Sequence, residues 1–180
     1  MKITIIGTHS TGKSTILKHL AEKLKQQNLN VYHVTELARC CPFPVNEDTT
    51  YEAQMWIQEK QIQEEVDYHT HDTIVLCDRA TLDNFAYMER AITDTDLTST
   101  KQRALDHMNT YDFIFKTQKL DIRSIDDDFR DTTDTFRDDI DTRITTLLED
   151  NNISYHLLPK TTDYDTHVHV IMDLIEKHKT

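Results

Sequence analysis

The sequence predicts an α/β domain in which a parallel sheet is covered by helices on both faces. Five short runs rich in β-branched and aromatic residues alternate with longer segments whose apolar residues recur at helical spacing. One run, TIVLC at residues 73–77, is apolar throughout, as expected for a strand buried on both faces of a parallel sheet. Because no linker, repeat or low-complexity segment divides the chain, we expect a single domain over residues 1–180.

The first half of the chain supplies three of the expected strands. KITII at residues 2–6 is a β-branched run, and VYHVT at 31–35 is a second one. Between them a helix is expected over 13–27, with the apolar face Ile16, Leu17, Leu20, Ala21 and Leu24. A second helix is expected over 49–69, with Tyr51, Met55, Ile62 and Val66 on one face. Strand 73–77 follows.

The second half continues the alternation. Residues 80–92 and 97–109 are expected to be helical, and DFIF at 112–115 is the fourth strand. A helix over 131–149 is indicated by the apolar face Phe136, Ile140, Ile144, Leu147 and Leu148. ISYHLL at 153–158 is the fifth strand, which Pro159 ends, and residues 163–178 form the last expected helix.

The composition narrows the range of partners. The chain has 20 Lys and Arg against 32 Asp and Glu, a net charge of −12, and such a field repels extended nucleic acid. No apolar run reaches the ~18 residues of a membrane-spanning helix, and the apolar N-terminal run stops at residue 7, too early for a signal peptide. The three cysteines make no C-x-x-C motif. We therefore expect a cytoplasmic protein without a membrane partner, and leave a homodimer open.

Residues 7–14, GTHSTGKS, match the phosphate-loop motif G-x-x-x-x-G-K-[ST]. The match lies between an expected strand and an expected helix, which is the context that the motif requires. Backbone N–H groups and the helix N-terminus would carry partial positive charge toward phosphates. We expect Lys13 to bridge the outer phosphates and the Ser14 hydroxyl to ligate Mg²⁺. The full expected phosphate-binding set is Gly7, Thr8, His9, Ser10, Thr11, Gly12, Lys13, Ser14 and Thr15.

Gly7 and Gly12 are the only glycines in the chain. The D-x-x-G switch of translation-factor and Ras-type GTPases needs a further glycine, and so does the signature of transporter ATPases. Both classes are therefore excluded.

Charged residues follow two of the expected strands. Asp78 and Arg79 end the 73–77 run, and Glu36 and Arg39 follow the 31–35 run. Ligands of open α/β sheets gather at the carboxyl ends of strands. There Asp78 could hold Mg²⁺ or accept a substrate proton, Glu36 could accept that proton, and the arginines could hold a phosphate or carboxylate. Two structural alternatives stay open: Asp78 as a helix N-cap, and Glu36 as a surface residue paired with Arg39.

The 49–69 helix carries polar residues beside its apolar face. Gln54 and Gln58 could read a base edge through paired donor and acceptor contacts, and Trp56 could stack on a ring. The alternatives are a solvated helix face for the glutamines and a core position for the tryptophan.

Three of the eight arginines are seven residues apart: Arg123, Arg130 and Arg137. They lie in the polar region 117–139, where a closing lid would cover ATP, exclude water and stabilise charge on the transferred group. The alternative is a solvated helix with ordinary charge pairs.

These motifs resemble the NadR/AAA_28 group of P-loop kinases. The resemblance rests on GTHSTGKST, on Glu36-Leu-Ala-Arg39, on Asp78-Arg79 with Leu82-Asp83-Asn84-x-Ala86-Tyr87, and on Asp127-Asp128-Phe129-Arg130 with Arg137. The group includes a ribosylnicotinamide kinase domain and is similar, more distantly, to deoxynucleoside and thymidylate kinases. The resemblance implies a three-layer P-loop NTPase with a five-stranded sheet ordered 2-3-1-4-5, ATP with Mg²⁺, and an arginine lid.

The expected function is therefore that of a kinase. It would transfer the γ-phosphoryl group of ATP to a small nucleoside- or nucleotide-like acceptor, with Lys13, Arg130 and Arg137 stabilising charge and Glu36 or Asp78 as the base. Arg123 would join the nucleotide site, and Arg39, Arg79, Gln54 and Gln58 would hold the acceptor. Two alternatives are a nucleotide-gated regulatory ATPase that acts through a protein partner, and an ATP-binding protein without turnover.

Overall fold

The computed structural model describes residues 1–45, 49–120 and 134–178. Its strands are β1 (Lys2–Ile6), β2 (Asn30–Val34), β3 (Thr73–Asp78), β4 (Phe113–Lys116) and β5 (His156–Leu157). Its α-helices are α1 (Lys13–Gln26), α2 (Tyr51–Tyr68), α3 (Thr81–Ala91), α4 (Thr98–Met108), α5 (Asp134–Asp150) and α6 (Tyr164–His178). The strands form one parallel sheet in the order β2-β3-β1-β4-β5. The predicted fold class and strand order are confirmed.

The fifth strand is shorter than the sequence predicts. Of residues 153–158, only His156 and Leu157 pair with β4, through Phe115 and Lys116. The Ile153 N–H instead donates to the carbonyl of Leu148 at 2.9 Å. This bond finishes the end of α5, so the chain reaches the sheet only at His156. The apolar run therefore predicted the strand correctly but not its start.

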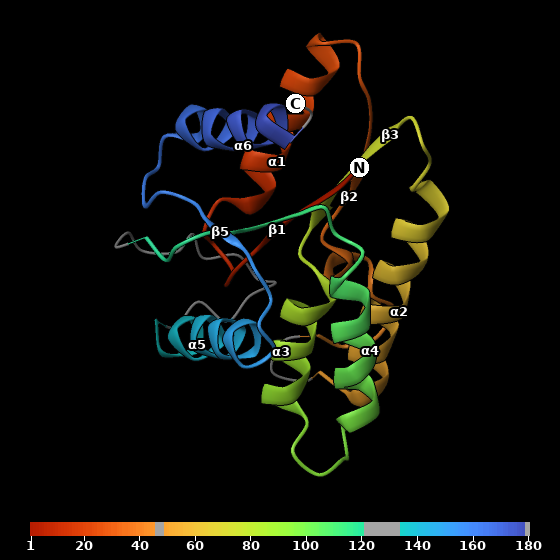
Figure 1. The fold of residues 1–180 in the computed structure, drawn as a ribbon. Coiled ribbons are helices and arrows are strands. Elements are labelled where there is room, and N and C mark those ends of the chain that lie inside the picture. The colour runs from red at the N-terminus through yellow and green to blue at the C-terminus, as the bar shows by residue number, and fades with distance from the viewer. Residues whose placement is uncertain (46–48, 121–133, 179–180) are drawn as a thin grey trace.

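The helices cover the sheet in two layers (Figure 1). Helices α1 and α6 lie side by side on one face, whereas α2, α3, α4 and α5 lie on the other. β1 is buried along its whole length, because it lies between β3 and β4 and is covered on both faces. The phosphate loop follows the carboxyl end of this central strand. The loop therefore starts from the most buried part of the sheet.

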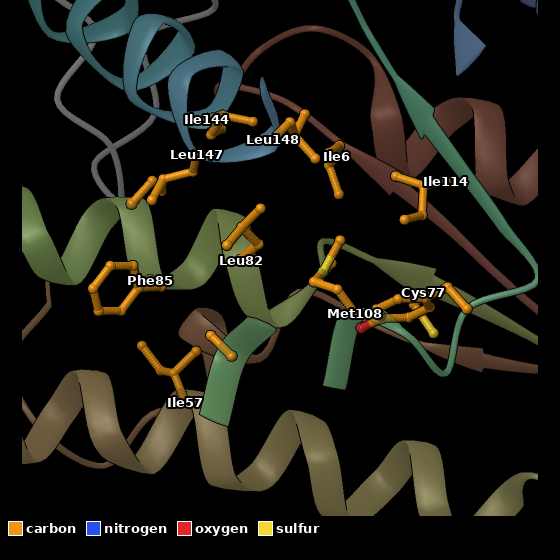
Figure 2. Close-up of a cluster of buried hydrophobic side chains, with 14 of the residues drawn as sticks. Ile6, Ile57, Cys77, Leu82, Phe85, Met108, Ile114, Ile144, Leu147 and Leu148 are labelled. Atoms are coloured by element: carbon orange, nitrogen blue, oxygen red, sulfur yellow. The ribbon is translucent and has the colours of Figure 1, made fainter. Parts of the chain in front are cut away.

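Each face of the sheet has its own apolar cluster. Ile3 and Ile5 of β1 point to the α1–α6 layer and pack with Leu17 and Leu20. On the opposite face, Ile6 packs with side chains from β3, α3, α4 and α5, as Figure 2 shows; these include Cys77, Leu82, Met108, Ile144 and Leu148. Lys2 and Thr4 alternate with the two isoleucines and therefore face the α2–α5 side, where they meet polar partners.

Two helices end in a turn made by asparagine. Asn28 follows α1 with φ of 60°, and Asn152 follows α5 with φ of 52°. These positions are usually taken by glycine, because a left-handed backbone crowds a Cβ atom, although asparagine tolerates it better than most residues. The chain thus closes these two helices without using either of its glycines.

In the part of the chain that the structure describes, no helix has both the length and the apolar character needed to cross a membrane.

Candidate active site

The phosphate loop turns from β1 into α1 through its two glycines. Gly7 has φ of 135° and Gly12 has φ of 85°, values that residues with a Cβ rarely adopt. A Cβ on Gly7 would collide with the Thr117 side chain, and one on Gly12 would come within 2.7 Å of the Tyr164 ring. Both ends of the loop are therefore closed to any larger residue.

Replacing Gly7 by alanine is expected to lower the free energy of unfolding by about 1–3 kcal/mol, because φ of 135° is strained for alanine and the new methyl group meets Thr117. The loop should also lose affinity for a nucleoside triphosphate. Urea unfolding and titration with a non-hydrolysable ATP analogue measure the two effects. Adding Thr117→Ala removes the collision but not the strain, so this double variant should recover only part of the stability. Wild-type stability and affinity in Gly7→Ala would contradict the prediction.

Lys13 begins α1 and is folded back onto the loop. Its Nζ donates to the carbonyl of Thr8 at 2.6 Å, and the side chain is buried. Burial, together with the neighbouring positive charge of Arg79, lowers the pKa of Lys13 to about 8. The carboxylates of Asp78, Glu36 and Asp83 offset this lowering only in part, and an anionic ligand beside Lys13 would further favour its charged form.

Ser14 and Asp78 meet at the carboxyl end of β3, where the Ser14 hydroxyl donates to the Asp78 carboxylate. A hydroxyl and a carboxylate are oxygen ligands of the kind that Mg²⁺ prefers, and Mg²⁺ usually keeps several water or phosphate ligands as well. Among the described residues, no group of three or more His, Cys, Asp or Glu side chains forms a metal site by itself. This pair therefore fits a metal held jointly with substrate phosphates.

Asp78 is not the N-cap of α3. The backbone N–H of Ala80, the N-cap residue, instead donates to the carboxylate of Asp83 at 2.8 Å. Burial raises the pKa of Asp83 to about 6, although Arg79 and Lys13 oppose this rise. Because Asp83 takes over the capping contact, Asp78 is left with the phosphate-loop serine.

Glu36 and Arg79 form a buried ion pair across the ends of β2 and β3. The Arg79 Nη2 and Nε donate to Glu36 Oε1 at 2.8 and 3.0 Å, and Arg39 Nε donates to Glu36 Oε2 at 3.0 Å. Glu36 is therefore buried and not a surface residue paired with Arg39 alone. Burial disfavours the charged form of Arg79, but Tyr87, Glu36 and Asp83 outweigh this effect and raise its pKa.

A cavity of about 90 Å³ adjoins this ion pair and the phosphate loop. Five predicted site residues line it: His9, Glu36, Arg39, Gln54 and Arg79. They come from the phosphate loop, the two strand ends and α2. The cavity thus brings together side chains from most of the segments in which the sequence predicted function.

Two predicted acceptor contacts differ in their surroundings. Gln54 lines the cavity, and its Nε2 donates to the Thr49 hydroxyl at 2.9 Å. Gln58, one turn later, is not among the lining residues; it is buried, and its Nε2 donates to the Thr100 carbonyl at 3.3 Å. Trp56 packs against the apolar cluster of the same layer. Among the three polar or aromatic candidates of this helix, only Gln54 therefore faces the cavity.

Of the three arginines at sevenfold spacing, Arg137 is described, whereas Arg123 and Arg130 lie outside the described residues. Arg137 is fully buried at the start of α5, and its guanidinium has no hydrogen-bond partner in the part of the chain that the structure describes. It makes an ion pair with the exposed Asp134 at 3.5 Å. The preceding residue, Phe136, contacts His9 of the phosphate loop, with ring centroids 5.5 Å apart. The beginning of α5 is thus packed against that loop.

The family AAA_28, described as an AAA domain, matches residues 2–166. The chain belongs to this family. A search of curated proteins found no match to this chain.

Solved structures share the fold of this AAA_28 chain. Two are of the deoxyadenosine kinase from M. mycoides, one with the products dCMP and a flexible dCDP and one with dATP. They are 17% and 18% identical, with TM-scores of 0.64 and 0.68, and the match covers 98% of this chain and 100% and 99% of theirs. The NadR protein in complex with NR is 19% identical, with a TM-score of 0.75. That match covers 98% of this chain and 50% of NadR, so the chain spans half the length of that protein.

The lining residues that were not predicted to belong to the cavity include Asn84, Tyr87, Arg90 and Phe136. The Tyr87 ring lies under the Arg79 guanidinium at 4.7 Å, and the Phe136 ring lies under that of Arg90 at 4.0 Å. The first three follow Asp78-Arg79 on α3 at helical spacing. Because that helix starts at the carboxyl edge of the sheet, one of its faces could have been recognised as part of the site.

Proposed function

We propose that this AAA_28 protein is a kinase that transfers the γ-phosphoryl group of ATP to a small nucleoside- or nucleotide-like acceptor. The observation that carries the proposal is the cavity beside the phosphate loop, lined by Glu36, Arg79 and Gln54. A protein that only hydrolyses ATP needs no such cavity, with a carboxylate and hydrogen-bonding groups, beside its phosphate loop. The nucleoside kinases with the same fold support this proposal by analogy.

The phosphate side is assigned to the loop and Lys13. Lys13 would exchange its bond to the Thr8 carbonyl for the outer phosphates of ATP, while the loop N–H groups surround the inner ones. Ser14 and Asp78 would hold Mg²⁺, which neutralises phosphate charge when it is bound. We assign Arg137 to the phosphate side as well, beside Lys13 and Mg²⁺. Its buried guanidinium has no hydrogen-bond partner in the described chain, which supports a role in binding an anion.

The acceptor side is assigned to Glu36, Arg79 and Gln54. Asp78 is engaged with Ser14, whereas Glu36 lines the cavity, so we assign the base to Glu36. It would accept the proton of the attacking hydroxyl and release part of its bond to Arg79 or Arg39. Gln54 would bind a polar edge of the acceptor. The buried Nδ2 of Asn84 has no hydrogen-bond partner among the described residues and offers a further donor in the cavity.

A lid around residues 117–139, with Arg123 and Arg130, stays part of the proposal, as do a single domain, a homodimer and a cytoplasmic location. The start of α5 supports the lid, because Phe136 links it to His9 and so to the phosphate loop. Closing there would exclude water from the transferred group, as phosphoryl transfer requires.

Binding of a triphosphate should weaken as the pH rises above about 8. In the free protein Lys13 loses its proton near this pH, whereas a bound triphosphate favours the charged form and raises the pKa. Affinity for a non-hydrolysable ATP analogue is therefore expected to be flat below pH 8 and to fall by up to about tenfold per pH unit above it. Calorimetric titrations across this range measure the effect, and Lys13→Met should remove it. A decline that persists unchanged in Lys13→Met would contradict the assignment to Lys13.

The function itself is tested by an acceptor screen. The protein is incubated with MgATP and, in separate reactions, nucleosides, nucleoside monophosphates and ribosylnicotinamide, and both ADP and the phosphorylated product are measured. We expect at least one acceptor to raise ADP formation manyfold above the rate in water, with an equal amount of product. ADP formation that no acceptor changes would overturn the proposal and favour the regulatory ATPase, and MgATP that stays intact for hours would favour a binding protein without turnover.

A further inference from the structure

The backbone of Arg79 is strained. Its φ is 84°, in the left-handed region that residues with a Cβ avoid. Such a conformation persists only where the surrounding structure holds it. At this residue the strain has a visible result: the side chain turns from the end of β3 back toward β2, where it reaches Glu36.

Three contacts fix the strained peptide groups of Arg79. Its N–H donates to the Ile5 carbonyl at 3.1 Å, and its carbonyl accepts from the Thr4 hydroxyl at 2.9 Å and from Gln61 Nε2 at 3.3 Å. The first two contacts come from β1, the neighbouring strand. Gln61 comes from α2, so it ties a different layer of the fold to the same carbonyl.

Gln61 is itself held in place by a buried glutamate one turn later on α2. Its Nε2 donates to Glu65 Oε1 at 2.5 Å, so the two hydrogens of the amide serve Glu65 and Arg79. The Tyr111 hydroxyl donates to the same Oε1 at 2.8 Å, and Lys2 Nζ donates to Oε2 at 2.9 Å. The fourth partner of Glu65, His107, contacts Oε2 at 2.7 Å. Gln61 and Glu65 lie outside the cavity lining, and the contact of Gln61 with the acceptor side is to the backbone carbonyl of Arg79.

We propose that Gln61 is a positioning residue, which holds the carbonyl of Arg79 so that its guanidinium stays on Glu36 at the acceptor cavity. Glu65 fixes the direction of the Gln61 amide, and the Thr4 hydroxyl donates a second hydrogen bond to the same Arg79 carbonyl. The inference rests on the proposed function, because it assigns Glu36 and Arg79 to the acceptor. It adds that the Gln61 amide of α2, which lies outside the cavity, aligns the acceptor side of the site.

The test compares Gln61→Met with Gln63→Met. Methionine keeps the length and burial of the glutamine at position 61 but removes both donors, whereas Gln63 is exposed on the same helix and bonds only Asp67 among the contacts that the structure describes. Using the acceptor found in the screen, we expect Gln61→Met to raise the acceptor KM about tenfold and to leave the KM of ATP within about twofold of wild type. Gln63→Met should change neither. A purely structural role would lower the melting temperature without this split between substrates, and equal acceptor KM values in the two variants would overturn the inference.

A second readout needs no activity. In NMR spectra the Arg79 Nε–H, assigned from its loss in Arg79→Lys, is bonded to Glu36 and should exchange slowly with water. We expect Gln61→Met to speed this exchange at least about tenfold; unchanged exchange would overturn the inference even if no acceptor is ever phosphorylated. If the screen finds no acceptor, the proposed function fails, and this exchange alone decides the positioning role.

A second pair of variants covers the case in which Gln61→Met does not fold. Thr4→Val removes the other side-chain donor to the Arg79 carbonyl, and Thr4→Ser keeps it. The valine variant should show the same fast exchange and raised acceptor KM, and the serine variant should behave as wild type. Identical behaviour of valine and serine variants, both like wild type, would count against the inference.

Discussion

Replacing Lys13 by methionine is expected to lower the rate of phosphoryl transfer by about a thousandfold. In the proposed reaction Lys13 neutralises charge on the oxygens of the transferred group, and methionine fills the same space without charge. The fold should survive, because burial already lowers the pKa of Lys13 to about 8, which means that its charge opposes folding at neutral pH. We expect a melting temperature equal to that of wild type or higher. Single-turnover transfer and thermal unfolding measure the two effects.

Lys18 offers a control for this variant. It lies on the same helix but is exposed, so Lys18→Met should change neither the rate nor the melting temperature appreciably. If Lys13→Met retained transfer near the wild-type rate, both the role of Lys13 and the proposed kinase chemistry would be contradicted.

Replacing Glu65 by leucine is expected to lower the free energy of unfolding by about 3–5 kcal/mol, the largest effect on stability that we foresee. Burial alone raises the pKa of Glu65, but the hydrogen bond from His107 and the charge of Lys2 outweigh it and lower that pKa, so the carboxylate is charged. Leucine would leave the buried ammonium of Lys2 without its counter-charge. Urea unfolding near neutral pH gives the free energy directly.

Two comparisons separate the charge effect from a simple loss of packing. Glu59 also forms an ion pair, with Arg103, but both side chains are about half-exposed, so Glu59→Leu should cost at most about 1 kcal/mol. Lys2→Met in the Glu65→Leu background removes both charges and should recover much of the lost stability. A Glu65→Leu variant as stable as Glu59→Leu would contradict the prediction.

The sequence predicted the alternation of strands and helices because the signal was strong in both. β1 is a β-branched run, β3 contains the run TIVLC, and α1 repeats its apolar face from Ile16 to Leu24. The start of β5 was predicted wrongly, since a hydrogen bond to the end of α5, and not the local apolar pattern, decides where pairing begins. Sequence patterns report burial well and report competition for a backbone group poorly.

The site, like the fold, could be predicted only in part. The phosphate loop follows from spacing alone, because its glycines, lysine and serine are adjacent in the chain. Glu36 and Arg79 were each found from their place at a strand end, but their mutual ion pair joins residues 43 positions apart and depends on the positive φ of Arg79. Gln61 and Glu65 carry no sequence signal of their own, since their pattern is that of any helix with polar residues on one face.

The asparagine turns that close α1 and α5 have a consequence for the unfolded chain. Glycine has the most backbone freedom to lose on folding, and a chain of this length would ordinarily carry about a dozen glycines. This chain carries 2 and sets two helix ends with Asn28 and Asn152 at positive φ instead. The backbone strain at those two turns is therefore offset in part by a stiffer unfolded ensemble, which has less conformational entropy to give up. A substitution at Asn28 or Asn152 will thus change the free energy of unfolding in two ways. It changes the strain of the native turn and the entropy of the unfolded chain, and these two contributions have opposite signs.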